Sequence, residues 1–141
     1  MNASMVNDLI TQWQGRLSRI SEAESAQVIG SKWTRKQVLG HLIDSAANNH
    51  QRFVRLQQGN LIGFPGYEQE EWVDAGNYNR NTWANLLELW TQYNRQLVIV
   101  IENIDSACKS NMWEEKSLSL ETIITDYAGH MLHHLEQLAK P

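Results

Sequence analysis

The sequence has almost no cysteine and no long apolar run, and both absences restrict what the protein can be. Its 141 residues include one cysteine, Cys108, so no disulfide can form within the chain, as is typical of a reducing compartment. No apolar run approaches the roughly 20 residues that a membrane-spanning helix needs. The N-terminal stretch MNASMVNDLI lacks the basic and apolar regions of a signal peptide. We therefore expect a cytoplasmic protein with no membrane partner.

Positive charge is also scarce. The chain has 12 Lys and Arg against 16 Asp and Glu, a formal net charge of −4, and its basic residues are scattered. A nucleic-acid-binding protein normally has a basic face, so we expect no nucleic-acid partner. The length is typical of a single domain, which we place at residues 1–141.

Apolar residues recur at intervals of three and four, the period of an amphipathic helix. Four such stretches predict helices at 4–22, at about 34–57, from Asn81 or Thr82 to Ile104, and from Ser119 to Leu138. The run Val-Ile-Val-Ile at 98–101 continues the stripe of the third helix, so we predict a helix there. The fold expected is an all-α four-helix bundle. On the first helix, the residues predicted to face the core are Met5, Leu9, Trp13, Leu17 and Ile20.

Polar residues mark where the last three of these helices begin. Thr34 and Gln37 have the spacing of a capping box. Asn81 or Thr82 can cap the third helix, and Ser119 the fourth.

Residues 58–81 are too long for an ordinary connection between helices of a bundle. This aromatic-rich loop between the second and third helices contains Phe64, Tyr67, Trp72 and Tyr78, and YEQEEWVDA within it predicts a short helix. Two interpretations stay open: a flap packed over one end of the bundle, or a wall of a substrate pocket.

Three of the five histidines lie in the stretch DYAGHMLHHLEQL at 126–138. Projected at about 100° per residue, His134 falls about 60° from the centre of the apolar arc, His130 about 100° on the same side, and His133 about 160° away. His130 and His134 therefore share a flank facing the bundle, one turn apart, where two imidazoles can bind one metal ion. Met131 occupies the position at which a zincin motif needs Glu, so a third ligand must come from elsewhere.

The second helix offers that ligand on a polar stripe of His41, Ser45, Asn48 and Arg52. Such a stripe is either a solvated face or one side of a site. It lacks the Glu and Lys that usually cover exposed helix surfaces. His50 falls toward the apolar side, as expected for a packing or surface residue.

The motifs WTRKQVLGHLIDS at 33–45, followed by Arg52 and Phe53, and HMLHHLEQL at 130–138 resemble the DinB/YfiT-like family of metal-binding four-helix bundles. The resemblance covers about residues 30 to 138. It implies that His41, His130 and His134 bind a divalent metal ion, which three imidazoles suggest is Zn²⁺ or Ni²⁺. It also implies a homodimer.

The family includes transferases and isomerases that use low-molecular-weight thiols such as bacillithiol or mycothiol, and proteins labelled hydrolases. We therefore expect transfer of a small thiol onto an electrophilic small-molecule substrate. Hydrolysis of an ester or amide, or metal or ligand binding without catalysis, are the alternatives. Asn48 and Arg52 are candidates to anchor a carboxylate. Asp44 and Asp126 are the nearest candidates for a general base, or else solvated residues or partners of the histidine rings.

Overall fold

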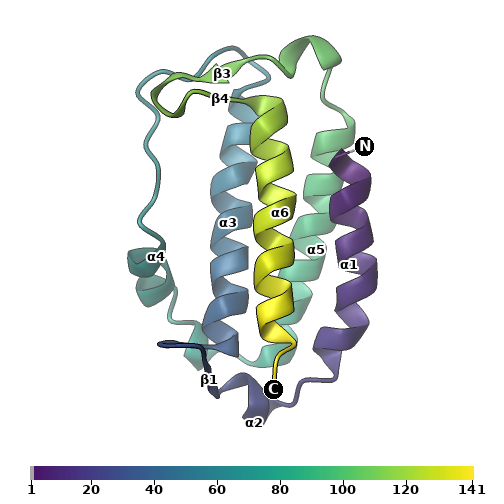
Figure 1. The fold of residues 1–141 in the computed structure, drawn as a ribbon, viewed down its shortest axis with the longest axis vertical. Helices are drawn as coiled ribbons and strands as arrows, with labels where there is room; N and C mark the ends of the chain where they lie inside the picture. Colours follow the sequence, from purple (N-terminus) through teal and green to yellow (C-terminus); the bar gives the residue numbers. More distant parts are fainter. Residues whose placement is uncertain (1) are drawn as a thin grey trace.

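Four long helices form a bundle in the computed structural model, which describes residues 2–141 (Figure 1). They are α1 (Asn2–Ser18), α3 (Arg35–Arg55), α5 (Trp83–Glu102) and α6 (Leu120–Leu138). The predicted all-α four-helix bundle is thus confirmed, including a helical conformation for 98–101. Within residues 2–141, none of the helices combines the length and the apolar character needed to cross a membrane.

The predicted helix starts are confirmed. At α3 the Thr34 hydroxyl accepts a hydrogen bond from the Gln37 amide (3.1 Å), and the Gln37 side chain accepts one from the Thr34 amide (3.0 Å). Thr82, and not Asn81, caps α5 by accepting from the backbone of Asn85 (3.1 Å). Ser119 caps α6. Each cap satisfies a backbone N–H group that the first turn of a helix leaves free.

The first helix differs from the prediction in its end. It stops at Ser18 and not at residue 22, and a separate short helix follows, α2 (Glu22–Ser25). Ser21 caps α2 through a capping box with Glu24. Because an N-cap residue adopts an extended backbone, this cap breaks the periodic stretch that the sequence presents as one helix.

Of the five residues predicted to face the core from the first helix, Trp13 and Leu17 are buried, and Leu9 and Ile20 are partly buried against the core. Met5 is 45% exposed, so its predicted place in the core is wrong. The buried side chains repeat at intervals of three and four, and they are Ala3, Val6, Ile10, Trp13 and Leu17. This stripe shares Trp13 and Leu17 with the predicted one, and packing against α5 and α6 selects Val6 and Ile10 for the rest of it.

The segment between α3 and α5 returns the chain to the end of the bundle at which α3 begins. In Figure 1, α3 runs upward, residues 56–68 return along the outside, and α5 again runs upward beside α3. The neighbours α3 and α5 are therefore parallel, whereas α6 runs antiparallel to α3. The return path contains α4 (Gln69–Gly76), which confirms the short helix expected there, and the 3₁₀ turn η1 (Tyr78–Arg80).

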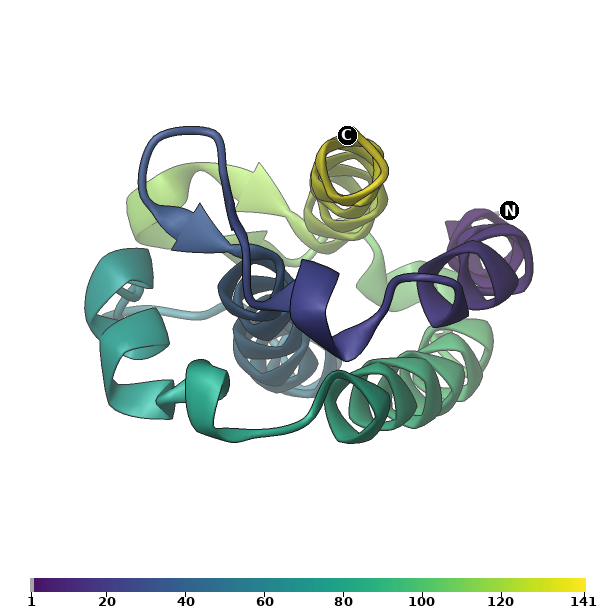
Figure 2. The ribbon, with the colours of Figure 1, turned by 90° about the horizontal axis from the view of Figure 1, so that it is seen from below.

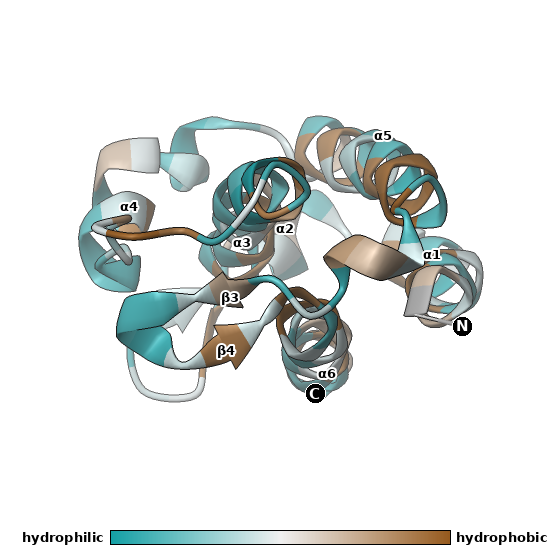
Figure 3. Cartoon of the chain, turned by 90° about the horizontal axis from the view of Figure 1, so that it is seen from above, coloured by the Kyte–Doolittle hydropathy of each residue, from teal (hydrophilic) through white to brown (hydrophobic). Residues whose placement is uncertain are grey.

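Two small hairpins that the sequence did not predict close the ends of the bundle. The strands β1 (Val28–Ile29) and β2 (Trp33–Thr34) pair antiparallel beside the start of α3 and the end of α6 (Figure 2). At the opposite end β3 (Met112–Trp113) pairs with β4 (Leu118–Ser119) (Figure 3), with the 3₁₀ turns η2 (Ser106–Cys108) and η3 (Glu114–Lys116) before and between them. Strands of two residues are too short to show an alternating pattern.

The second hairpin is tied to the returning segment. The Leu61 amide donates to the carbonyl oxygen of Met112, and the Glu114 amide donates to that of Leu61, both at 2.9 Å. The indole of Trp113 donates to the carbonyl oxygen of Phe64 (3.1 Å). These bonds hold the aromatic loop against the bundle end next to α6.

The ring of Tyr78 packs on α3 at Gly40, which has no side chain. A Cβ atom on Gly40 would lie 2.1 Å from Cδ2 of Tyr78, and one on Gly76 would lie 2.5 Å from Cε2 of the same ring. The Tyr78 hydroxyl donates a hydrogen bond to the buried carboxyl of Asp44. The position of the return path thus depends on glycine at 40.

We predict that Gly40→Ala lowers the free energy of unfolding by about 1–3 kcal/mol, because overpacking displaces the Tyr78 ring. Gly129→Ala is the matched control, since Gly129 lies in α6 and has no neighbour within 4 Å of its added Cβ. That substitution should stabilise by about 0.5–1 kcal/mol. Urea unfolding followed by circular dichroism measures both. Equal effects of the two substitutions would contradict the packing of Tyr78 on Gly40.

Candidate metal centre

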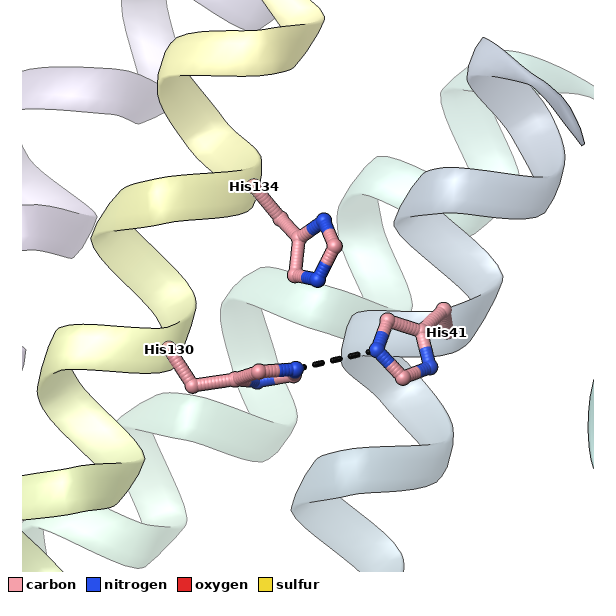
Figure 4. A group of neighbouring side chains, drawn as sticks. All are labelled: His41, His130 and His134. Carbon is pink, nitrogen blue, oxygen red and sulfur yellow. Dashed lines mark hydrogen bonds between the residues drawn. The ribbon is translucent and has the colours of Figure 1, made fainter. Parts of the chain in front are cut away.

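Three histidines from two helices meet inside the bundle. His41 extends from α3, and His130 and His134 extend from successive turns of α6 (Figure 4). The antiparallel packing of α3 on α6 places these faces opposite each other. His41 is fully buried, and the other two are half-buried.

The ring nitrogens of these histidines are close together. Nε2 of His41 and Nε2 of His130 are 3.0 Å apart, and one nitrogen from each of the three rings lies within 4.8 Å of the others. Imidazole nitrogens bind Zn²⁺ at about 2.0–2.1 Å, so two ligands of one ion lie at most about 4.2 Å apart. The His41–His130 pair meets this limit, and the whole cluster comes close to it.

Burial keeps these rings neutral. It lowers the pKa of His41 to about 3, with a smaller contribution from the positive charges that His130 and His134 would carry. It lowers the pKa of His130 to about 4 in the same way, helped by His134 and His133. The pKa of His134 is also lowered by burial, although its hydrogen bond with Gln137 opposes the shift. Neutral imidazole is the form that binds a metal ion.

Neighbouring side chains orient two of the rings. The Trp33 ring lies 5.1 Å from that of His41, centroid to centroid. Nδ1 of His134 donates a hydrogen bond to Oε1 of Gln137 (3.0 Å), which leaves Nε2 of His134 free to bind a metal ion. Nδ1 of His41 is buried and has no hydrogen-bond partner among residues 2–141. Three neutral imidazoles, two of them with oriented rings, fit a divalent metal ion.

The two remaining histidines lie outside the cluster. His133 is exposed. Nδ1 of His50 forms a hydrogen bond with the hydroxyl of Tyr93 on α5 (2.9 Å), which agrees with its expected packing role.

Two cavities adjoin the cluster from different sides. The smaller, here called the arginine cavity, has a volume of about 230 Å³, and its lining includes His130, Asn49, Arg52, Tyr67 and Asp126. The larger, here called the hairpin cavity, has a volume of about 780 Å³. It is lined by residues 28–33 of the first hairpin and by residues near the end of the chain that include His133, His134 and Glu136. The histidine cluster therefore lies between two spaces that small molecules can enter.

Of the other predicted site residues Arg52, Asn48 and Asp44, only Arg52 lines one of the two cavities. Arg52 lines the arginine cavity, but Asn48 does not, and its amide donates to the backbone oxygen of Asp44 (2.9 Å). The neighbouring Asn49 lines the cavity instead. Asp44 lines neither cavity, and burial raises the pKa of its carboxyl while the Tyr78 hydroxyl opposes that rise.

The aromatic loop contributes to both interpretations that its sequence left open. Tyr67 lines the arginine cavity, so part of the loop is a pocket wall. Phe64 packs on Trp113 at the end of the bundle, with ring centroids 6.0 Å apart, and Trp72 is 42% exposed. Trp113, which also lines the cavity, had no sequence signal that distinguished it from a core residue.

Comparison with known proteins identifies the family and supports the fold. The family model of the DinB superfamily matches residues 8–138. YfiT from Bacillus subtilis, described as a probable metal-dependent hydrolase with an unusual four-helix bundle topology, is similar in structure, with a TM-score of 0.82. The alignment covers 97% of this chain and 81% of YfiT at 15% identity, so it supports a shared fold. No curated protein matches the sequence significantly. Because the family model matches nearly the whole chain, this protein belongs to the DinB superfamily.

Proposed function

We propose that His41, His130 and His134 bind a divalent metal ion and that the protein transfers a low-molecular-weight thiol onto a small electrophile. The observation that carries this proposal is the position of the cluster between two cavities, one reaching His130 and the other His134. A transfer between two substrates needs two binding spaces that meet at the reacting atoms. Hydrolysis of a single substrate by water needs only one.

A divalent ion held by His41, His130 and His134 would lower the pKa of a thiol or a water molecule bound to it. The protein keeps the three histidine rings neutral and orients two of them. The histidines keep their lone pairs because burial holds them neutral at physiological pH. Trp33 and Gln137 restrict the rings of His41 and His134.

In the proposed reaction the thiol gives its proton to solvent and its sulfur forms a bond with the electrophilic carbon. The leaving group departs from that carbon with the bonding electron pair. This reaction requires no proton donor for the leaving group when that group is a stable anion. The side-chain carboxyl groups in the linings of the two cavities, Asp126 and Glu136, are both exposed, which is compatible with a reaction that needs no buried proton donor.

Metal-dependent hydrolysis is the second candidate, and the similarity in fold to YfiT favours it. In that reaction Asp126 is the candidate base in the lining of the arginine cavity. A bundle that binds metal without catalysis is the outcome if neither reaction is found.

Metal binding is tested first. We predict that the protein, stripped with a chelator, binds one equivalent of Zn²⁺ or Ni²⁺, because three ligand atoms converge. His41→Ala and His130→Ala should each weaken binding by more than about 100-fold. His133→Ala is the matched control, since this exposed histidine of α6 lies outside the cluster and should leave the affinity unchanged. Isothermal titration calorimetry and elemental analysis measure the effect, and equal losses for His130→Ala and His133→Ala would contradict the assignment.

Catalysis is tested with matched substrates. We predict that the metal-loaded protein accelerates conjugation of a small thiol to monochlorobimane above the rate of the metal-free protein, measured by fluorescence. His130→Ala should abolish this acceleration, whereas His50→Ala, which changes a histidine outside the cluster and outside both cavities, should keep it. Cleavage of a nitrophenyl ester without conjugation would instead identify a hydrolase, and the absence of both activities would contradict an enzymatic role with these substrate classes.

A further inference from the structure

The guanidinium of Arg52 is half-buried in the lining of the arginine cavity and has no anionic partner. Among residues 2–141, no carboxylate lies within ion-pair distance of it. One of its Nη atoms donates to Oδ1 of Asn49 (3.2 Å), while Nε is buried without a hydrogen-bond partner among those residues. A buried cation without a counterion is costly to desolvate, so an arginine of this kind is most stable when an anion completes its environment.

Aromatic side chains hold the guanidinium in place. Its central carbon lies 4.5 Å from the centroid of a Trp113 ring and 5.7 Å from that of Tyr67. Aromatic contacts of this kind restrict the planar guanidinium and leave the N–H groups on its edge free to donate hydrogen bonds to a planar anion. Arg55, one turn away on the same helix, is exposed, and its Nε donates to Oε1 of Gln51 (2.9 Å). Of these two arginines, only Arg52 lines the cavity that reaches His130.

The only carboxyl in this lining does not neutralise Arg52. Asp126 is exposed on α6 and forms no ion pair with Arg52. Water screens the charge of Asp126, whereas the charge of Arg52 is partly shielded from water. The interior of the cavity is therefore suited to a negative group.

We propose that Arg52 binds a carboxylate of the thiol substrate, and so selects an anionic thiol for the arginine cavity. This inference rests on the proposed function, because it assigns the thiol to the space between Arg52 and His130. The volume of about 230 Å³ suits a molecule of the size of a modified amino acid. The hairpin cavity at His134 then receives the electrophile.

Two thiols that differ in one group test this assignment. N-acetylcysteine carries a carboxylate, and N-acetylcysteamine is the same molecule without it. The metal-loaded wild type should bind N-acetylcysteine at least about tenfold more tightly in isothermal titration calorimetry, as expected for hydrogen bonds to a charged group. Arg52→Gln should remove this preference, Arg52→Lys should keep part of it, and Arg55→Gln, the matched control, should leave it unchanged. If Arg52→Gln does not fold, the comparison of the two thiols on the wild type decides.

The outcomes separate this inference from the proposed function. Conjugation of both thiols to monochlorobimane with equal kcat/KM, together with equal affinity, overturns the role of Arg52 and leaves the transferase standing. Conjugation of neither thiol contradicts the transferase, and the Arg52-dependent preference in binding then decides the inference alone. A preference for iodoacetate over iodoacetamide that Arg52→Gln removes, without a preference between the thiols, would place the anion on the electrophile and overturn the assignment to the thiol.

Discussion

The antiparallel packing of α3 against α6 is the contact on which the site depends. Each helix buries an apolar face, with side chains such as Leu42, Phe53, Ile124 and Met131 almost inaccessible to water. This packing fixes the axial position of one helix relative to the other, because side chains in a dense interior have few alternative arrangements. The axial position in turn decides which residues face each other, and it brings Nε2 of His41 to 3.0 Å from Nε2 of His130.

The polar side of α3 is an unusual feature for a helix inside a bundle. His41, Asp44, Ser45 and Asn49 are all buried, and buried polar groups reduce stability unless they find partners. Asp44 accepts from Tyr78, and Asn49 donates to the backbone oxygen of Ser45 (2.9 Å). One atom of each of three side chains on α3 still has no hydrogen-bond partner among the described residues: Nδ1 of His41, Oδ2 of Asp44 and Nε of Arg52. The proposed anionic ligand would complete the environment of Arg52, and the proposed metal ion would bind the side of His41 that faces α6. The same helix that supports the core thus also carries the proposed chemistry.

The elements outside the four long helices build the spaces around the cluster. The first hairpin provides the wall of the larger cavity beside His134, and it places Trp33 against His41. The return path between α3 and α5 provides Tyr67, and the second hairpin provides Trp113, on the side of His130. These segments contain few buried apolar side chains of their own and are positioned by backbone hydrogen bonds such as those of Leu61. They are thus the parts in which a substrate pocket can change while the bundle stays the same.

Local patterns in the sequence determined the four long helices, the caps of the last three and the pair His130 and His134, because residues three and four apart on a helix are neighbours whatever the rest of the fold. They missed the break at Ser21 that separates α1 from α2. They also identified the polar stripe of α3. They could not decide between Met5 and Val6 as core residues, or between Asn48 and Asn49 as cavity residues, since in each case both stripes have helical spacing. That choice depends on the rotation of each helix against its neighbours. The contact of His41 with α6, the two cavities and the unpaired charge of Arg52 were decided by tertiary packing alone, because they join residues far apart in the chain.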